Sequence, residues 1–482
     1  MSTSTRRTSR KSPVQTATGL IAICACLLIA LLFSPQAEVT KLVYPVATVA
    51  IGLWLYATQP PLYLGFVWWV WLITPFVRRV IDFQTGGFDP VNPAVLAPLL
   101  VTCLTVLTFV RFFNRIVERR YFPFLLCLLG VVYGYFVGVA KAGLVPATYG
   151  LLGWIAPLFF GFHCLLFWKL YPRHRAVVRT TFSWGVLILG VYAVYQYLAA
   201  PAWDMQWLVQ SGMTSSMGRP EATEFRLFST LNSTAPFATF MMAGLLLLFD
   251  GRGLVSRLAL APGYISFLLA LVRSTWGGWV VGMTIILARS RGYSRTRTIA
   301  TLAVGAILCI PLIVFSPNTD RISDRADTIV NLGDDTSLQE RIRLYEEGTL
   351  NAILNPIGIG IGSLGTAARL DAPAGNGDSA VNAIVFDSGV LAIPLTLGWP
   401  GTTLYLGGLI WMIFVALRIS QADADQFAVI GVSIVIALMA MMLFSNQLKG
   451  LSGMMVWSFL GFALASKQYH HSRSHSSGVS VA

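Results

Sequence analysis

Four arginines lie beside apolar runs or on a polar helical segment, where their side chains could bind a charged ligand. Arg226 lies in EFRLFSTLN, Arg273 in LVRSTWGGW, and Arg341 and Arg343 in SLQERIRLYEEGTLNAIL. Guanidinium groups bind phosphate through paired, charge-assisted hydrogen bonds. The alternative is that each arginine pairs with a nearby acid or extends to lipid headgroups. We expect Arg226 and Arg273 together to serve a phosphate-bearing ligand.

Hydroxyl and amide side chains accompany the first two arginines. They are Ser229, Thr230, Asn232, Ser233, Thr234, Ser274 and Thr275. They could hydrogen-bond phosphate or sugar hydroxyls, or they could cap the helices that follow, and the two roles are compatible.

Asp387 immediately precedes an apolar run, in NAIVFDSGVLAIPLTLGWPG. A carboxylate at a membrane boundary is costly and is therefore a functional candidate. We expect it to act as a general base toward a hydroxyl group. The alternative is an N-cap for the next helix.

The glycine-rich segment IGIGIGSLG resembles a nucleotide-binding turn only superficially, because that motif requires a strand, a glycine turn and a helix in a soluble domain. A tight turn that brings backbone N–H groups to a phosphate is the remaining hypothesis. All six cysteines lie in apolar runs, and the five histidines lack metal-ligand spacing. We expect no disulfide framework and no metal site, although three tail histidines (His470, His471, His475) could hold a metal weakly.

Composition identifies the elements that must position these residues. The chain is 55% hydrophobic and 11% charged, with a mean hydropathy of +0.68. Long apolar runs recur along it and show no strand-like alternation. We therefore expect an all-α polytopic integral membrane protein with about fourteen transmembrane helices. The expected spans are 17–33, 41–57, 61–77, 93–110, 123–140, 146–168, 181–199, 234–249, 256–272, 275–288, 298–315, 390–417, 427–445 and 450–466.

The distribution of basic residues sets the expected orientation. With both termini in the cytoplasm, most of the 34 lysines and arginines fall on the inner side, as the positive-inside rule requires. The pair Arg78 and Arg79 falls outside and opposes this assignment. The net charge of +13 is then explained by the basic residues on the cytoplasmic side, which face anionic lipid of the inner leaflet. We therefore expect no nucleic acid partner.

This topology divides the chain into five parts. They are a cytoplasmic N-terminal tail (1–16), a transmembrane bundle of spans 1–11 (17–315) with a periplasmic loop at 200–233, a large periplasmic loop (316–389), the C-terminal spans (390–466) and a cytoplasmic tail (467–482). The first span could also be a signal peptide, but it is long and lacks a clean cleavage site, so we expect a retained anchor. In the large loop, Ser337 and Glu340 form a capping box that opens a helix, and Pro356 ends it.

Four segments in order resemble the O-antigen ligase and polymerase superfamily, which acts on undecaprenyl-diphosphate-linked glycans. They are FRLFSTLNSTAPFATFM, RSTWGGWVVG, RIRLYEEGTLNAILNPIGIGIGSLG and FDSGVLAIPLTLGWPG, within residues 225–405. Ligases of this superfamily usually have a histidine where this chain has Asp387. The departure favours the branch of exopolysaccharide polymerases, of which the xanthan-type polymerase is an example.

The resemblance implies a glycosyltransferase of the bacterial inner membrane that uses neither a metal nor a nucleotide sugar nor any other cofactor. Arg226, Arg273 and Arg341 would neutralise the lipid diphosphate as it leaves, and Asp387 would orient or deprotonate the acceptor hydroxyl. Further candidates for binding the diphosphate or glycan are Arg343, Ser274, Asn232 and Tyr345. The implied partners are the lipid-linked oligosaccharide, the bilayer, a flippase and a chain-length regulator.

Three other functions remain open. A ligase would transfer a finished glycan to an acceptor such as lipid A core or protein. A flippase would also suit about fourteen spans, although such transporters often have repeated halves, which this sequence lacks. A polyprenyl-phosphate-monosaccharide glycosyltransferase would need acidic metal ligands in its first outer loop, and that loop offers Glu38 alone.

Overall fold

The computed structural model describes residues 37–251, 253–289, 296, 299, 345–346, 348–350, 352–364, 388–418 and 425–478. Among these residues the regular elements are all helices, and one isolated bridge joins Gly218 to Phe225. The all-helical, polytopic membrane class expected from the composition is thus confirmed.

The described helices run from α2 to α14 and, after residues 290–388, from α18 to α20. The first group is α2 (Ala37–Thr58), α3 (Pro60–Gln84), η1 (Pro93–Leu96), α4 (Ala97–Cys103), α5 (Val106–Arg111) and η2 (Phe113–Arg115). The second is α6 (Phe122–Ala142), α7 (Leu144–Leu166), η3 (Trp168–Leu170), α8 (Tyr171–Ala199), α9 (Ala202–Gln210) and α10 (Thr214–Met217). The third is α11 (Thr234–Leu247), η4 (Leu248–Asp250), α12 (Leu254–Leu258), α13 (Leu260–Leu269), α14 (Arg273–Arg289), α18 (Gly389–Leu417), α19 (Gln426–Met441) and α20 (Gly450–Gly478).

Eight described helical stretches are long and apolar enough to cross a membrane. They are Glu38–Thr58, Pro60–Gln84, Pro93–Arg111, Phe122–Ala142, Leu144–Leu166, Trp168–Ala199, Gly389–Leu417 and Gln426–Leu443, and two shorter apolar stretches are Thr234–Asp250 and Leu254–Leu269. The expected span 17–33 lies outside the described residues, as does 298–315 except for Ile299. The total of fourteen spans therefore stays a prediction.

Three helices extend well beyond the apolar runs that predicted them. α3 continues to Gln84, past the expected 77, α8 begins at Tyr171, ahead of the expected 181, and α20 continues to Gly478, past the expected 466. Hydropathy detects the part of a helix inside lipid, whereas a helix continues into water wherever its polar residues tolerate that conformation. Conversely, the expected helix 93–110 is broken into η1, α4 and α5.

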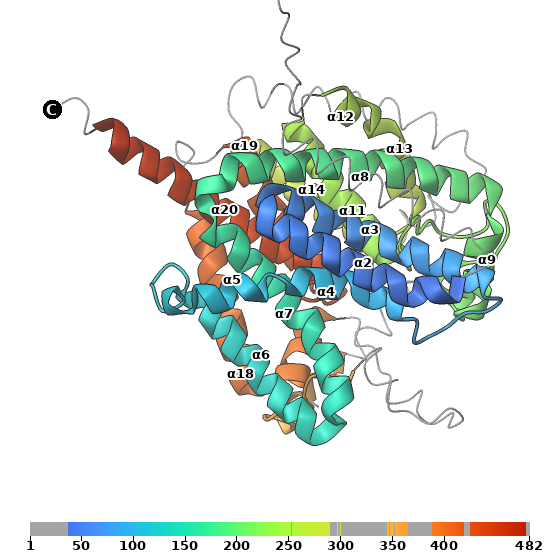
Figure 1. The fold of residues 1–482 in the computed structure, drawn as a ribbon, viewed down its shortest axis with the longest axis horizontal. Coiled ribbons are helices and arrows are strands. Elements are labelled where there is room, and N and C mark those ends of the chain that lie inside the picture. Colours follow the sequence, from blue (N-terminus) through green and yellow to red (C-terminus); the bar gives the residue numbers. More distant parts are fainter. Residues whose placement is uncertain are drawn as a thin grey trace, which may run out of the picture.

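The helices form a main bundle with an arm. In Figure 1, α2, α3 and α8 run side by side across the bundle, and α6, α7 and α18 form the arm below it. α6 packs on both α7 and α18, while α20 crosses between arm and bundle by packing on α7 and α19. The core is rich in large aromatic side chains, including Trp68, Trp457 and Phe182. Close packing in this apolar core holds the helices, and therefore the residues at their ends, in fixed relative positions.

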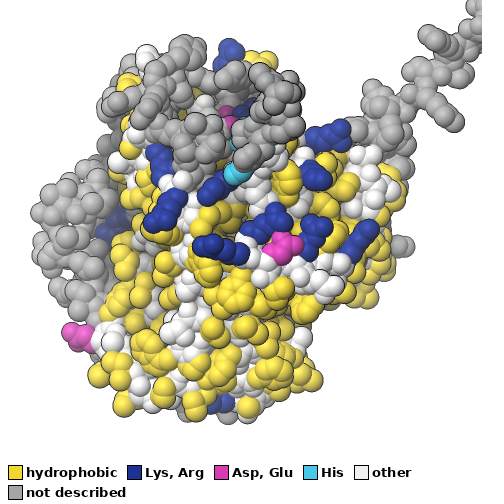
Figure 2. Space-filling model, turned by 90° about the vertical axis from the view of Figure 1, so that its left-hand side faces the viewer, with side chains coloured by type: hydrophobic (Ala, Val, Ile, Leu, Met, Phe, Trp, Pro, Cys, Tyr) yellow, Lys and Arg dark blue, Asp and Glu magenta, His cyan; other side chains and the backbone are white. Residues whose placement is uncertain are grey.

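Basic side chains gather on one face, which Figure 2 shows above a broad hydrophobic surface. We call the basic face the end of the bundle where α8 and α19 begin and α14 and α18 end, with Arg175 and Arg289 among its residues. Contacts there join helix ends that are distant in sequence. Arg175 at the start of α8 binds Asp425 before α19 at 2.7 Å and Asp250 after α11 at 3.2 Å. Arg289 at the end of α14 donates to the Leu417 carbonyl at the end of α18. The clustering is what the positive-inside rule predicts for one membrane side.

Candidate functional site

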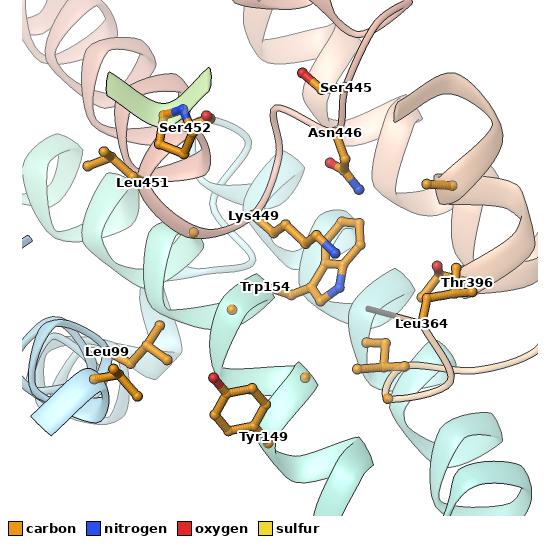
Figure 3. A pocket seen from close by; sticks show the side chains of 18 of the residues that line it. Leu99, Tyr149, Trp154, Leu364, Thr396, Ser445, Asn446, Lys449, Leu451 and Ser452 are labelled. Carbon is orange, nitrogen blue, oxygen red and sulfur yellow. The ribbon is translucent and has the colours of Figure 1, made fainter. Parts of the chain in front are cut away.

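A cavity of about 510 Å³ lies at the opposite ends of these same helices. Pro236 at the start of α11 and Thr396 in the first part of α18 line it. Ser445 and Lys449 line it from the connection between α19 and α20. The basic face contains the end of α18, the start of α19 and the end of η4, which follows α11, so the cavity and the basic face lie at opposite ends of the bundle. We call it the site cavity (Figure 3).

Lys449 supplies the positive charge of the site cavity. Figure 3 shows its side chain extending into the cavity from the α19–α20 connection, near Asn446 of the same connection. Among the described residues that line the cavity there is no Asp or Glu, and in the described part of the chain no group accepts a hydrogen bond from the Lys449 ammonium. The side chain contacts the open space of the cavity, but protein surrounds it on most sides. This burial lowers the pKa of Lys449 below the usual value for lysine.

The rest of the wall is mainly apolar and aromatic. Trp71, Leu99 and Trp154 contribute large side chains, and Tyr149 lies at the same wall in Figure 3. A cavity of this size, apolar with a few converging polar groups, is typical of a small-ligand site. An isolated cation in such surroundings favours an anionic ligand, because the ligand charge replaces the hydration that the ammonium has lost.

Arg273 begins α14 at the same end of the bundle. Gly278 of α14 lies against Met441 at the end of α19, and Gly282 lies against Ala437 one turn earlier on that helix. The two helices are thus antiparallel, and the first residues of α14 are level with the connection that follows α19. The backbone places Arg273 and Ser274 at the end of the bundle that holds Lys449.

Arg226, expected to bind phosphate, donates to backbone carbonyl groups. Its Nε and Nη2 donate to Ala270 at 3.2 Å and Leu271 at 2.8 Å, and its Nη1 donates to Ser216 at 3.2 Å. These first two carbonyls follow α13, where a helix end leaves carbonyl groups without intrahelical partners. Leu271 has a positive φ of 53°, so the chain turns sharply there before Arg273. Arg226 therefore holds the turn that positions Arg273.

The pair Arg78 and Arg79, which opposed the expected orientation, is explained by local acids. Arg79 is fully buried and binds Asp204 at 2.8 Å, and it also donates to the carbonyls of Ser229 and Leu231. Arg78 pairs with Asp82 at 3.1 Å. Arg79 thus fixes the segment that leads into α11, next to the site cavity.

Asn232 and Tyr345, which were also expected to bind the diphosphate or glycan, differ in their hydrogen bonding. The Oδ1 atom of Asn232 is buried without a hydrogen-bond partner in the described part of the chain, so its amide remains a candidate for a ligand. The Tyr345 hydroxyl donates to the Leu443 carbonyl at 2.5 Å and accepts from Ser388 at 2.7 Å. Tyr345 therefore ties the loop helix to the end of α19. The expected residues Asp387, Arg341 and Arg343 lie outside the described residues.

The glycine-rich turn lies against a break in α18. Pro400 has no N–H, so the Thr396 carbonyl lacks its helical partner, and Trp399 donates instead to the Pro356 carbonyl. The two carbonyls freed in this way, of Leu395 and Thr396, accept from the N–H groups of residues 359 and 360. Gly398 permits the break with its positive φ of 64°.

This arrangement leaves the first part of the turn no free backbone N–H group for a phosphate, and phosphate binding by residues 362–364 stays a prediction. The N–H groups of residues 358–361 all donate to protein carbonyls, including that of Gly134 in α6. The turn is held further by Lys141, whose ammonium donates to the Gly358 carbonyl at 2.7 Å. Its contribution to the site cavity is a wall formed by Ile361, Gly362 and Leu364.

Lys449 is the candidate that sequence reasoning missed. It belongs to a four-residue connection between two apolar runs, on the outer side of the expected topology, where a basic residue opposes the charge bias. The arginines expected on the outer side share this property. No neighbouring motif accompanies Lys449, so the sequence alone does not single it out.

Residues 258–406, about a third of the chain, match the family model described as O-antigen ligase. The match covers Arg273, the glycine-rich turn and the broken part of α18, and Lys449 lies beyond it. It confirms the resemblance to the O-antigen ligase and polymerase superfamily. Among curated proteins no match is found.

Proposed function

Since residues 258–406 carry an O-antigen ligase domain, we propose that the protein polymerises glycan repeat units at the site cavity. The donor is a repeat unit linked to a polyprenyl diphosphate, and the acceptor is a sugar hydroxyl of another lipid-linked unit. The observation that carries this proposal is the Lys449 ammonium, which has no acidic partner among the described residues and extends into a largely apolar cavity.

The reaction requires the protein to stabilise the negative charge on the leaving diphosphate, and it needs no covalent intermediate with the protein. The acceptor oxygen forms a bond to the anomeric carbon, and the bond from that carbon to the diphosphate oxygen breaks. The lipid diphosphate leaves with the bonding electrons, and the hydroxyl proton passes to a base. Lys449 and Arg273 would stabilise the charge that develops on the diphosphate, and we assign the base to Asp387.

The cavity suits the chemical parts of this donor. Its aromatic and aliphatic wall, with Trp71 and Leu99, would accept the first apolar units of the polyprenyl chain. Its volume of about 510 Å³ is sufficient for a diphosphate and adjoining groups, so most of the glycan would extend into solvent. The clustering of basic residues at the other end of the bundle supports a periplasmic position for this cavity.

The description of the matched family favours a second candidate, a ligase that transfers a finished glycan to a different acceptor. Product analysis in a strain that lacks the gene separates the two. A polymerase predicts lost polymer and accumulated single repeat units on the lipid carrier. Accumulation of long lipid-linked chains would overturn the polymerase assignment in favour of the ligase.

The strain that lacks the gene also tests whether the site cavity is needed for polymer formation. Complementation with Lys449→Gln should leave single units accumulated, whereas Lys169→Gln should restore polymer, because Lys169 is an exposed lysine at the opposite end. Both variants must reach wild-type abundance in the membrane. Full-length polymer from Lys449→Gln at normal abundance would refute the role of this lysine.

A further inference from the structure

A second cavity, of about 420 Å³, opens on the basic face and is separate from the proposed reaction. Helices α6, α7, α18 and α20 contribute to its walls. Apolar side chains include Leu165, Met412 and Leu464, and all three are buried by the surrounding helices. This part of the cavity wall is therefore apolar and suited to hydrocarbon.

Its rim is cationic. Arg119, Arg120 and Lys467 line the opening, and one acid, Glu118, pairs with Arg120 at 2.6 Å. Within the described part of the chain, neither Arg119 nor Lys467 forms an ion pair. Among the described residues, two positive charges thus remain uncompensated at the rim of an apolar cavity.

Two tryptophans lie near this rim and indicate its position relative to the membrane surface. Trp168 and Trp411 line the cavity, and Trp411 is 37% exposed on a surface of α18 that also exposes Ile410 and Phe414. Tryptophan favours the boundary between lipid headgroups and hydrocarbon. Because Trp411 both lines the cavity and is exposed beside these apolar side chains, a lipid chain on this side of α18 would have access to the cavity.

We infer that this cavity binds an anionic phospholipid. The headgroup phosphate lies between Arg119 and Lys467, and an acyl chain follows Trp411 and Met412 into the apolar depth. A free phosphate would satisfy the rim and leave the depth empty, and a neutral lipid would fill the depth without compensating the charges. Basic pockets between transmembrane helices on the cytoplasmic side bind anionic headgroups in the same way.

Native mass spectrometry of the purified full-length chain tests this inference by counting bound lipid during titration with phosphatidylglycerol. The variant Arg119→Gln/Lys467→Gln removes both uncompensated charges. We expect it to weaken phosphatidylglycerol binding by roughly 25-fold, or about fivefold for each charge near a lipid surface. Titration with phosphatidylcholine should give weak binding to all forms.

The control is Arg111→Gln/Arg115→Gln, which removes the same charge from residues outside the cavity. It should change phosphatidylglycerol affinity less than about twofold. Equal losses in the two double variants would show attraction to general surface charge and would overturn the inference. Equal affinity for phosphatidylcholine would also overturn it, as would displacement of the lipid by millimolar inorganic phosphate.

The exposed position of Arg119 supplies a second variant in case the double substitution impairs folding. Arg119→Gln alone should keep the wild-type thermal transition in detergent and still weaken phosphatidylglycerol binding roughly fivefold. Unchanged lipid affinity in this folded single variant would contradict the site. Polymer formation is not measured in these experiments, so their outcome is independent of the proposed reaction.

Discussion

The cationic residues away from the basic face serve two distinct purposes. Arg79 donates to backbone carbonyls of the segment that leads into α11, and Arg226 to those of the turn between α13 and α14. Lys449 instead presents its charge to a cavity. The residue types alone do not separate these roles, because the carbonyl partners of each arginine come from distant parts of the sequence.

The buried pair of Arg79 and Asp204 should be sensitive to removal of one partner. Arg79→Met leaves Asp204 buried without its counter-charge, which costs about 3–5 kcal/mol of stability. The expected result is a lower thermal transition in detergent and reduced membrane abundance. Arg120→Met, whose ion pair with Glu118 is exposed, should cost less than about 1 kcal/mol. Equal effects of the two substitutions would contradict the structural role of Arg79.

Lys449 should give donor binding a distinctive dependence on pH. Its pKa is lowered by burial, and a bound diphosphate favours the protonated form, so donor affinity should fall as pH rises through that lowered pKa. Lys449→Arg should remove this loss at alkaline pH, because guanidinium stays charged. The measurement is KM for a lipid-linked repeat unit between about pH 7 and pH 10. An identical pH profile for wild type and Lys449→Arg would exclude Lys449 as the titrating group.

Among the elements, the broken helix α18 and the glycine-rich turn form one unit. The turn supplies the hydrogen bonds that Pro400 and Gly398 remove from the helix, and glycines of α6 let it approach closely. Small residues spaced along a membrane helix commonly permit such close backbone contact. The unit forms one wall of the site cavity through Ile361, Gly362 and Thr396.

Gly138→Ala tests this close approach. A Cβ there would lie 2.0 Å from the Ile361 carbonyl oxygen, so the turn must move, at a cost of about 1–3 kcal/mol. The expected result is a lower thermal transition together with reduced polymer output. Gly407→Ala in α18 adds the same methyl group to open space and should change stability by less than about 1 kcal/mol. If Gly138→Ala behaves like Gly407→Ala, the packing of turn against α6 is not as described.

The sequence predicted the helices well and their irregularities poorly. Apolar runs such as 123–140 and 427–445 reappear as α6 and α19, because a membrane span must be apolar along its length. The pairing of the turn with α18 joins residues about forty positions apart, and no local preference encodes it. Gly398 and Pro400 predict an interruption of the helix, but they do not indicate which N–H groups would donate to the carbonyls that it leaves free.

At the scale of the whole molecule, charge separates the two ends of the bundle. Arg78 and Arg79 pair with Asp82 and Asp204 at the end that holds the site cavity, and the basic residues cluster at the other end, where Asp250 and Asp425 pair with Arg175. Counts of lysine and arginine predicted that basic residues would gather on one side, and which side faces the cytoplasm stays a prediction. The sequence could not locate the site cavity, since that space is enclosed by helices from the whole length of the chain.

Cysteine labelling in intact cells tests the orientation. A cysteine at Arg219, in the exposed segment before α11, should react with a membrane-impermeant maleimide, and a cysteine at Arg115 should react only after permeabilisation. The background is a chain with its native cysteines replaced. Labelling of the Arg115→Cys variant in intact cells would reverse the orientation and move the site cavity to the cytoplasm.

The most direct test of the central claim is polymerisation by the purified protein in liposomes, with one polyprenyl-diphosphate-linked repeat unit as both donor and acceptor. Wild type and Lys169→Gln should form lipid-linked products of two or more units at equal rates. Lys449→Gln should be slower by roughly thirtyfold, the loss of one hydrogen bond from a charged group. Equal rates for Lys449→Gln and wild type, or product that appears only with a different acceptor, would contradict the account.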